Sequence, residues 1–159
     1  MKAEYINPFL HSAKNVLETM CQTPVTPQKP LLKPDQVTYG AITGIIAMSS
    51  ERVKGNLIVS FEEKCILKII ANMLMEDPKE EIDAEVVDAV GELTNMICGS
   101  AKSHLAKLEQ IFDMSTPTIL VGKGVDIKNF AGTPTITIPF STANGNFVVE
   151  ANLYDLRLK

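Results

Sequence analysis

The feature that most constrains this chain is a repeated segment, because one pattern occurs twice at a constant offset of 88 residues. Six of fourteen positions are identical between the two copies. The identical residues are Glu4, Asn7, Ser12, Ala13, Lys14 and Leu17 in the first copy, and Glu92, Asn95, Ser100, Ala101, Lys102 and Leu105 in the second. A Gly-Asn pair followed by an apolar run also recurs, at 55–56 and 145–146. The chain therefore predicts a pseudo-symmetric duplication with repeats of about 4–75 and 84–159, each a helix followed by a strand pair.

Three segments have the apolar spacing of amphipathic helices. The first is expected over 8–21, with Asn7 as its N-cap and Pro8 at the first helical position. The second is expected over 62–75, and its predicted buried residues are Cys65, Ile66, Ile69, Ile70, Met73 and Leu74. The third follows an acidic stretch, and Asp83 is its predicted N-cap.

The remaining apolar runs are rich in β-branched residues and predict strands. Runs 39–49 and 55–61 predict one antiparallel hairpin, and runs 133–142 and 145–156 predict a second one. A shorter strand is expected within 115–122. The predicted class is α+β, with long helices packed on an antiparallel or mixed sheet.

Proline dominates the segment 23–34, which contains four of these residues. Proline cannot donate a backbone hydrogen bond, so this segment cannot form a helix or a central strand. We expect an extended connector that lies along the surface.

Length and charge bound the possible functions. With 159 residues and 45% hydrophobic content, the chain can bury one substantial core, and we expect a single domain over 1–159. A net charge of -4 and the lack of a Lys/Arg cluster argue against nucleic acid as a partner. No segment reaches the roughly 18 apolar residues of a membrane span, and the first residues lack the apolar run of a signal peptide. We therefore expect a cytoplasmic protein with no membrane partner.

Residues that commonly bind metals are few and scattered. Cys21, Cys65 and Cys98 are widely spaced among apolar neighbours, which favours reduced packing residues over disulfides or zinc ligands. His11 and His104 have no cysteine or acidic cluster at ligand spacing. We expect no metal and no cofactor bound by the chain itself.

The polar side of the third predicted helix is the candidate site. At about 100° per residue, one side carries the apolar residues Val86, Val90, Leu93, Ile97, Ala101 and Leu108. The opposite side carries Asp88, Glu92, Asn95, Gly99 and Lys102. Glu92 and Asn95 are three residues apart, so their side chains are neighbours that can reach one shared site on a partner. Gly99 costs the helix about 1 kcal/mol relative to alanine but lets another surface come close, and Gly91 is a candidate for the same role on the flank.

Two explanations remain open for the Glu92/Asn95 pair on these grounds. One is chance, because many solvated helix faces carry a glutamate and an asparagine at this spacing. The other is that the two residues form a recognition site. For the first copy we expect a structural role, because Asn7 precedes Pro8 and caps the helix, which leaves Glu4 outside it.

Five segments together resemble a known family. They are EYINPFLHSAKNVLETM, KGNLIVSF, GELTNMICGSAKSHL, STPTILVG and IPFSTANGNFVVEANL, and they extend over nearly the whole chain. The chain is similar to the CheX branch of the CheC/CheX/FliY family of chemotaxis phosphatases. This resemblance implies a CheC-like fold and an aspartyl-phosphate protein phosphatase, a hydrolase, that dephosphorylates the response regulator CheY. CheX-like members keep one active Glu-x-x-Asn helix, where CheC-like members often have two.

The resemblance also implies a role for each site residue. Glu92 is expected to pair with the active-site lysine of the regulator, and the Asn95 side chain is expected to orient the attacking water. The receiver domain is expected to supply Mg²⁺. Further contacts with the partner are expected from Asp88, Met96, Gly99, Lys102 and Ser103. A homodimer joined through sheet edges is a further expectation.

The sequence departs from the family pattern at two places. Thr94 replaces a small alanine, and we expect its side chain to point toward the helix flank. In the segment MSSERVKGN, no glycine directly follows the first strand, where one is expected.

Two other functions remain possible. One is a non-catalytic CheX-like binding or adaptor domain for a receiver or a flagellar-switch protein. The other is a small-ligand domain, which would need a converging polar pocket that the sequence does not reveal.

Overall fold

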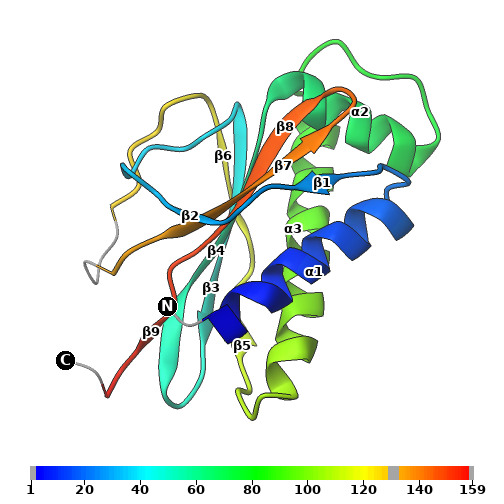
Figure 1. Cartoon of the computed structure of the whole chain (residues 1–159). Helices are drawn as coiled ribbons and strands as arrows, with labels where there is room; N and C mark the ends of the chain where they lie inside the picture. Colours follow the sequence, from blue (N-terminus) through cyan, green and yellow to red (C-terminus); the bar gives the residue numbers. More distant parts are fainter. Residues whose placement is uncertain (1–2, 129–132, 158–159) are drawn as a thin grey trace.

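The computed structural model describes residues 3–128 and 133–157, which form three helices and a nine-stranded sheet. The strand pairs in these residues are antiparallel. Figure 1 shows helices α1 and α3 crossing each other on one side of the sheet, while long connectors arch away on the other side. The α+β class is therefore confirmed, and the sheet is antiparallel rather than mixed.

Helix α1 spans Ala3–Thr19 and starts earlier than predicted. Pro8 lies inside this helix rather than at its first position, and its ring removes one backbone hydrogen bond. Ile6 packs against the core, and its burial helps to offset that loss. The prediction that Asn7 caps the helix and leaves Glu4 outside is wrong, because both residues are helical.

Helix α2 spans Glu63–Leu74, within one residue of the prediction at each end. It ends at Met75, which has a left-handed backbone with φ of 57°. The predicted buried face is confirmed for Cys65, Ile66, Ile69 and Ile70, and Met73 is partly buried. Leu74 was assigned to that face wrongly: its position in the last turn leaves it 39% exposed.

Helix α3 spans Ala84–Ala106 and is the longest of the three. The Asp83 carboxylate accepts a hydrogen bond from the backbone N–H of Val86 at 3.0 Å, so the predicted N-cap is confirmed. Its buried positions include Val86, Val90, Leu93, Ile97, Ala101 and Leu105. Leu108 lies beyond the end of the helix and is 41% exposed, so its assignment to the buried face was wrong.

Two hairpins form the centre of the sheet, as predicted. Strand β3 (Ile42–Ser49) pairs with β4 (Val53–Phe61), and β7 (Ile136–Thr142) pairs with β8 (Gly145–Ala151). Strands β4 and β8 join the hairpins, which gives the order β1-β7-β8-β4-β3-β5.

Short strands extend both edges of the sheet. Strands β1 (Thr26–Pro27) and β2 (Leu31–Leu32) pair with β7, whereas β5 (Asp113–Met114) and β6 (Thr118–Val121) pair with β3. Strand β9 (Tyr154–Asp155) pairs with β4. The proline-rich connector is thus partly paired rather than only extended along the surface. Its prolines are compatible with this arrangement because both strands are short and lie at an edge.

Gly55 lies inside β4, which begins two residues before the predicted run 55–61. An added Cβ at Gly55 would lie 2.4 Å from the backbone oxygen of Asn152, so the close approach of two backbones requires glycine there. Gly145 instead starts β8 with φ of +124°, a conformation that side chains disfavour. The glycines of the two Gly-Asn pairs therefore have different structural roles.

The two faces of the sheet differ in character because successive side chains alternate between them. Toward the helices, the strands contribute core residues that include Ile46, Leu57, Val59, Phe61, Phe140, Phe147 and Val149. The opposite face carries buried polar side chains, including Thr43, Ser60, Thr137, Glu150 and Asn152. The connectors cover this polar face.

Candidate functional site

The candidate site is the outward stripe of α3, and its orientation agrees with the prediction. Asp88, Glu92 and Asn95 are exposed, and the opposite side of the helix is buried. Of the other residues predicted to meet a partner, Ser103 is exposed, and the half-buried ones are Met96, Gly99 and Lys102.

Glu92 and Asn95 are available for an intermolecular contact. Within the part of the chain that the structure describes, neither side chain forms a hydrogen bond or an ion pair with another residue. At a spacing of three residues they are separated by about 4.5 Å along the helix axis. One carboxylate and one amide can therefore enter a single site on a partner together.

Gly99 keeps the surface beyond Asn95 open. No atom lies within 4 Å of the position that a Cβ would take there. Gly91 behaves differently from the expectation, since its Cβ position would face Pro117 at 3.8 Å and Ile119 at 3.9 Å. Gly91 therefore packs near the start of β6, and Gly99 alone of these two glycines opens the surface to a partner.

Thr94 anchors the helix beneath the site rather than pointing to the flank. Its hydroxyl donates a hydrogen bond to the Val90 carbonyl oxygen at 2.7 Å, and the residue is fully buried. A Cβ at Gly44 in β3 would lie 2.2 Å from this hydroxyl oxygen, so the glycine makes room for it. The expected flank orientation was wrong because the helical rotation places position 94 on the sheet side.

The first copy of the pair is also exposed, on α1. Glu4 and Asn7 both lie on the outward side of this helix. One turn after Asn7, His11 takes the position that corresponds to Gly99 at the offset of 88. Lys14 follows, and its ammonium forms a salt bridge with Glu18 at 3.0 Å. The two copies therefore share a pair but not its surroundings.

The cysteines do not contribute to the site. All three are buried and none is in a disulfide. Burial raises the pKa of Cys98 to about 11, so this thiol is protonated and unreactive at neutral pH.

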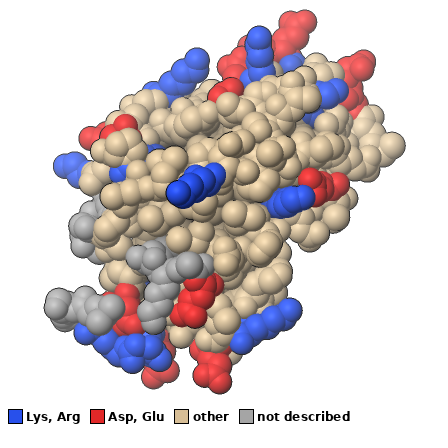
Figure 2. All heavy atoms as spheres, in the orientation of Figure 1, with Lys and Arg blue, Asp and Glu red and all other residues tan. Residues whose placement is uncertain are grey.

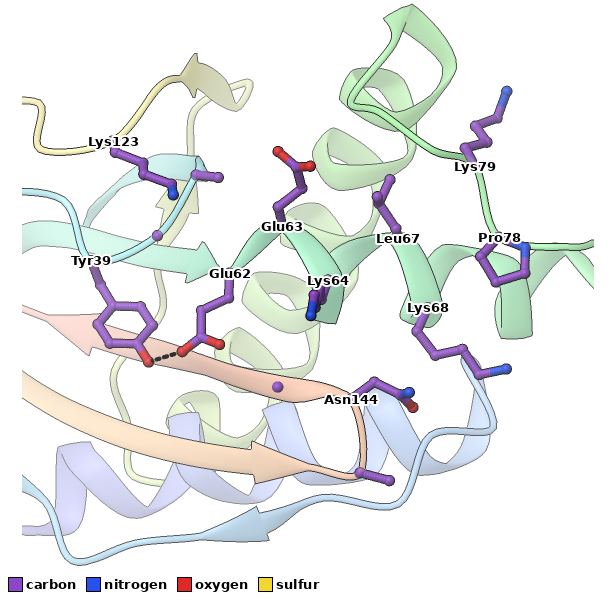
Figure 3. Close-up of a pocket in the computed structure, with 14 residues that line it drawn as sticks. Tyr39, Glu62, Glu63, Lys64, Leu67, Lys68, Pro78, Lys79, Lys123 and Asn144 are labelled. Atoms are coloured by element: carbon purple, nitrogen blue, oxygen red, sulfur yellow. Dashed lines mark hydrogen bonds between the residues drawn. The ribbon is translucent and has the colours of Figure 1, made fainter.

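A hollow with a volume of about 1020 Å³ lies at the start of α2, away from the α3 stripe. Figure 3 shows Tyr39, which donates a hydrogen bond to Glu62, at one end of this hollow, and Lys68 further along α2 toward its other end. None of the predicted site residues lines this hollow. Sequence reasoning missed it because its walls come from five separate segments.

On the face drawn in Figure 2, charged side chains are not collected into one patch. Figure 2 shows side chains of both signs interspersed near the margins of that face, with uncharged atoms over most of the rest. Among the helices that the structure describes, none is long and apolar enough to cross a membrane.

The same fold occurs in solved structures. A CheC-like superfamily protein from Shewanella sp. PV-4 is 42% identical, with 97% of this chain and 99% of that chain covered and a TM-score of 0.89. The complex of CheX with CheY, BeF3 and Mg²⁺ from Borrelia burgdorferi is similar at 25% identity, with 94% and 97% covered and a TM-score of 0.78. The fold is therefore CheC-like.

Sequence comparison is more specific than the fold. The family described as chemotaxis phosphatase CheX matches residues 42–141. The CheY-P phosphatase CheX of Thermotoga maritima is 25% identical over 131 residues, which is 82% of this chain and 83% of that protein. The chain belongs to the chemotaxis phosphatase CheX family. The matched range contains Glu92 and Asn95 but not the first copy of the pair.

Proposed function

We propose that this protein removes the phosphoryl group from the aspartyl phosphate of a CheY-like receiver domain, with the α3 stripe as its active surface. The observation that carries the proposal is the Glu92/Asn95 pair, exposed and without a partner in the described chain, in a member of a phosphatase family. This class of reaction needs positioning and charge stabilisation more than covalent chemistry, so a helix face can suffice.

Asn95 is proposed to orient the attacking water. An amide donates and accepts hydrogen bonds at once, and it stays neutral beside a phosphoryl group that would repel a carboxylate. Its exposed position on a rigid helix supports this role, because the side chain can enter the active site of another protein.

Glu92 is proposed to pair with a lysine of the receiver. A carboxylate suits this role because a charged hydrogen bond both attracts and orients an ammonium group. The absence of a competing cation bonded to Glu92 in the described chain supports this pairing. Glu92 would then contribute both to docking of the receiver and to catalysis.

The phosphoryl group and the magnesium ion are proposed to belong to the receiver. The Borrelia burgdorferi complex contains CheY, BeF3 and Mg²⁺, and BeF3 is a chemical stand-in for a phosphoryl group. Magnesium supplies charge neutralisation at phosphoryl oxygens. This chain would contribute the amide and the carboxylate only.

The docking face is proposed to include the rest of the stripe. Gly99 lets the receiver backbone approach closely, while Asp88 and Lys102 offer charges at the two ends. Met96 and Ser103 extend the face on its flank.

We propose that only the α3 copy is active. His11 supports this inference because it puts a bulky side chain where the α3 copy has Gly99, so a partner cannot approach α1 in the same way. The family match, which contains Asn95 but not Asn7, agrees with it.

The duplication predicted from the sequence is proposed to be a feature of this fold. If β1 is exchanged with β5, β3 with β7 and β4 with β8, the strand order β1-β7-β8-β4-β3-β5 becomes β5-β3-β4-β8-β7-β1. This is the original order read backwards, which supports a pseudo-two-fold relation between the two halves. Superposition of α1-β3-β4 on α3-β7-β8 in an experimental structure tests this idea. A rotation far from 180° would contradict it.

A homodimer through a sheet edge is also proposed. Val121 on β6 supports it, because this edge residue is 57% exposed. Sedimentation velocity should show a dimer that Val121→Asp weakens, and a wild-type monomer at high concentration would contradict the proposal.

The decisive experiment separates a phosphatase from an adaptor. Receivers from the same genome are phosphorylated with magnesium present, and the release of phosphate is timed with and without this protein. Binding to each receiver in its BeF3 form is measured in parallel. A phosphatase accelerates phosphate loss from at least one receiver that it binds. An adaptor for a receiver or flagellar-switch protein binds without acceleration, and that outcome would overturn the proposal.

A further inference from the structure

A second cavity lies on the polar face of the sheet, opposite the helices. It has a volume of about 190 Å³, and it is lined by strand residues and by described residues of two connectors, among them Lys33, Gln36 and Ile127. Figure 1 shows these connectors arching over the side of the sheet away from α1 and α3. The cavity is therefore distinct from the candidate active surface.

The floor of this cavity is one row of residues across four neighbouring strands. Thr118 pairs with Ile45, Ile45 with Ile58, and Ile58 with Glu150. The middle of the row is apolar and its two ends are polar. Such a floor combines an apolar contact surface with a few fixed polar groups, which is typical of small-molecule sites.

The roof is tied down by backbone hydrogen bonds. The N–H of Lys33 donates to the Thr135 carbonyl at 2.8 Å, and the N–H of Ile127 donates to the Gln36 carbonyl at 2.7 Å. Both bonds join the two connectors to each other, and the Lys33–Thr135 bond lies next to the paired strands β2 and β7.

A buried ion pair lies at the Glu150 end of this floor. The Lys33 ammonium contacts both Glu150 carboxylate oxygens, at 2.8 and 2.9 Å. Their side chains are only 11% and 3% exposed, respectively. Removing two charges from water is costly, and the cavity places this pair against an apolar floor. An occupant therefore meets a positive and a negative charge side by side.

An amide donor also remains open toward the cavity. The Asn152 side-chain oxygen accepts from the backbone N–H of Asn56 at 2.7 Å, which fixes the orientation of the amide. The Asn152 amide nitrogen, on a residue that lines the cavity, donates to no group in the described chain. This nitrogen is free to donate to a ligand or to water in the cavity.

We propose that this cavity binds a free amino acid. An α-amino acid carries its carboxylate and its ammonium on the same α-carbon. Its carboxylate can therefore face Lys33 while its ammonium faces Glu150. The Asn152 amide offers a further donor to the ligand carboxylate, and Ile45 and Ile58 contact a short side chain. The volume is below the ~300–1,000 Å³ of drug-sized sites, which excludes nucleotides.

The test is isothermal titration with each proteinogenic L-amino acid in turn. At least one should bind saturably. Its amine analogue without the carboxylate and its acid analogue without the ammonium should each bind on the order of tenfold or more weakly, because one charged hydrogen-bonding partner is lost. No saturable binding at millimolar concentration, or equal binding of either analogue, would overturn the proposal.

Two variants locate the binding in the cavity. Ile45→Phe fills the cavity from its floor, and Thr118→Tyr fills it from the exposed end of the same row. Ala47→Val is the matched control, since Ala47 lies on the same face of β3 but does not line the cavity. Circular dichroism checks that each variant folds.

Binding should be lost in both filled variants and kept in the control. Binding that persists in a folded filled variant contradicts the assignment. The phosphatase assay plays no part in this test, so its outcome is independent of the proposed function.

Discussion

Helices α1 and α3 carry the same Glu-x-x-Asn pattern on exposed faces, but their surroundings differ. In α3 the pair is followed by Gly99, which leaves the surface open. In α1 the pair is followed at once by Pro8, and His11 stands at the position that corresponds to Gly99. The matching residues therefore do not define equal sites.

Under the proposed function, this difference means that the Glu-x-x-Asn signature depends on access by a partner as much as on its two residues. In the proposed mechanism a receiver must bring its backbone near the amide before the water can be positioned, and the bulk of the side chain one turn away would decide whether it can. The following changes test this comparison between α1 and α3.

Gly99→Trp should have the largest effect on docking. The indole would occupy the open surface, and binding of the receiver in its BeF3 form should weaken on the order of 10²-fold or more, because steric conflict at an interface is strongly unfavourable. His11→Trp on α1 is the matched control and should leave binding within about twofold. Normal binding by a folded Gly99→Trp protein would place the docking face elsewhere.

Glu92→Ala should weaken binding and slow turnover together, by about tenfold in binding, because an ion pair with the receiver is lost. Titration of the receiver and phosphate release measure the two effects. The counterpart Glu4→Ala should change neither. Equal effects of both substitutions would remove the distinction between the helices.

Gly44→Ala should lower stability by about 1–3 kcal/mol, because the new methyl group would meet the Thr94 hydroxyl beneath the site. Gly99→Ala should instead raise it by up to about 1 kcal/mol, since nothing lies near that position and alanine favours a helix. Urea unfolding followed by circular dichroism gives both values. If both substitutions changed the stability in the same direction, the packing of Thr94 against β3 would be contradicted.

The smallest effect concerns the helix starts. Asp83→Ala should lower the urea midpoint, because it removes the N-cap of α3, whereas Asn7→Ala should leave the midpoint nearly unchanged, because Asn7 lies inside α1. A larger fall for Asn7→Ala would restore the capping role that the sequence predicted.

The pH dependence of this cap gives a second check. A hydrogen bond from Lys79 and then one from the Val86 backbone hold the pKa of Asp83 below its ordinary value. The stabilisation is therefore present above about pH 4, the pKa region of an unfolded aspartate, and is lost as pH falls through the folded pKa. Asp83→Asn should show less of this loss, since its amide caps without titrating.

Periodicity in the sequence predicted the elements with a strong local signal. Three helices, both hairpins, the Asp83 cap and the outward angle of Glu92 and Asn95 follow from spacing alone. These features depend on neighbours within a few residues, so they can be predicted without knowledge of the tertiary contacts.

Features that depend on long-range contacts were missed. The start of α1 was placed at Pro8 because the burial of Ile6 against the core was not visible in the sequence. Thr94 was assigned to the flank because its space is created by Gly44, fifty residues earlier. The cavity beside the Lys33–Glu150 pair could not be predicted either, because the two residues of this pair are 117 positions apart in the sequence.

The most direct measurement compares Asn95→Ala with Asn7→Ala on one phosphorylated receiver that the wild type dephosphorylates. Phosphate release is timed at saturating receiver with magnesium present, and binding to the BeF3 form is measured for each variant. Asn95→Ala should slow turnover on the order of 10²-fold or more with little change in binding, because a positioned polar group is lost from the transition state. Asn7→Ala should stay within about twofold of the wild type. Near-normal turnover by Asn95→Ala, or an equal loss in Asn7→Ala, would contradict the assignment of catalysis to α3.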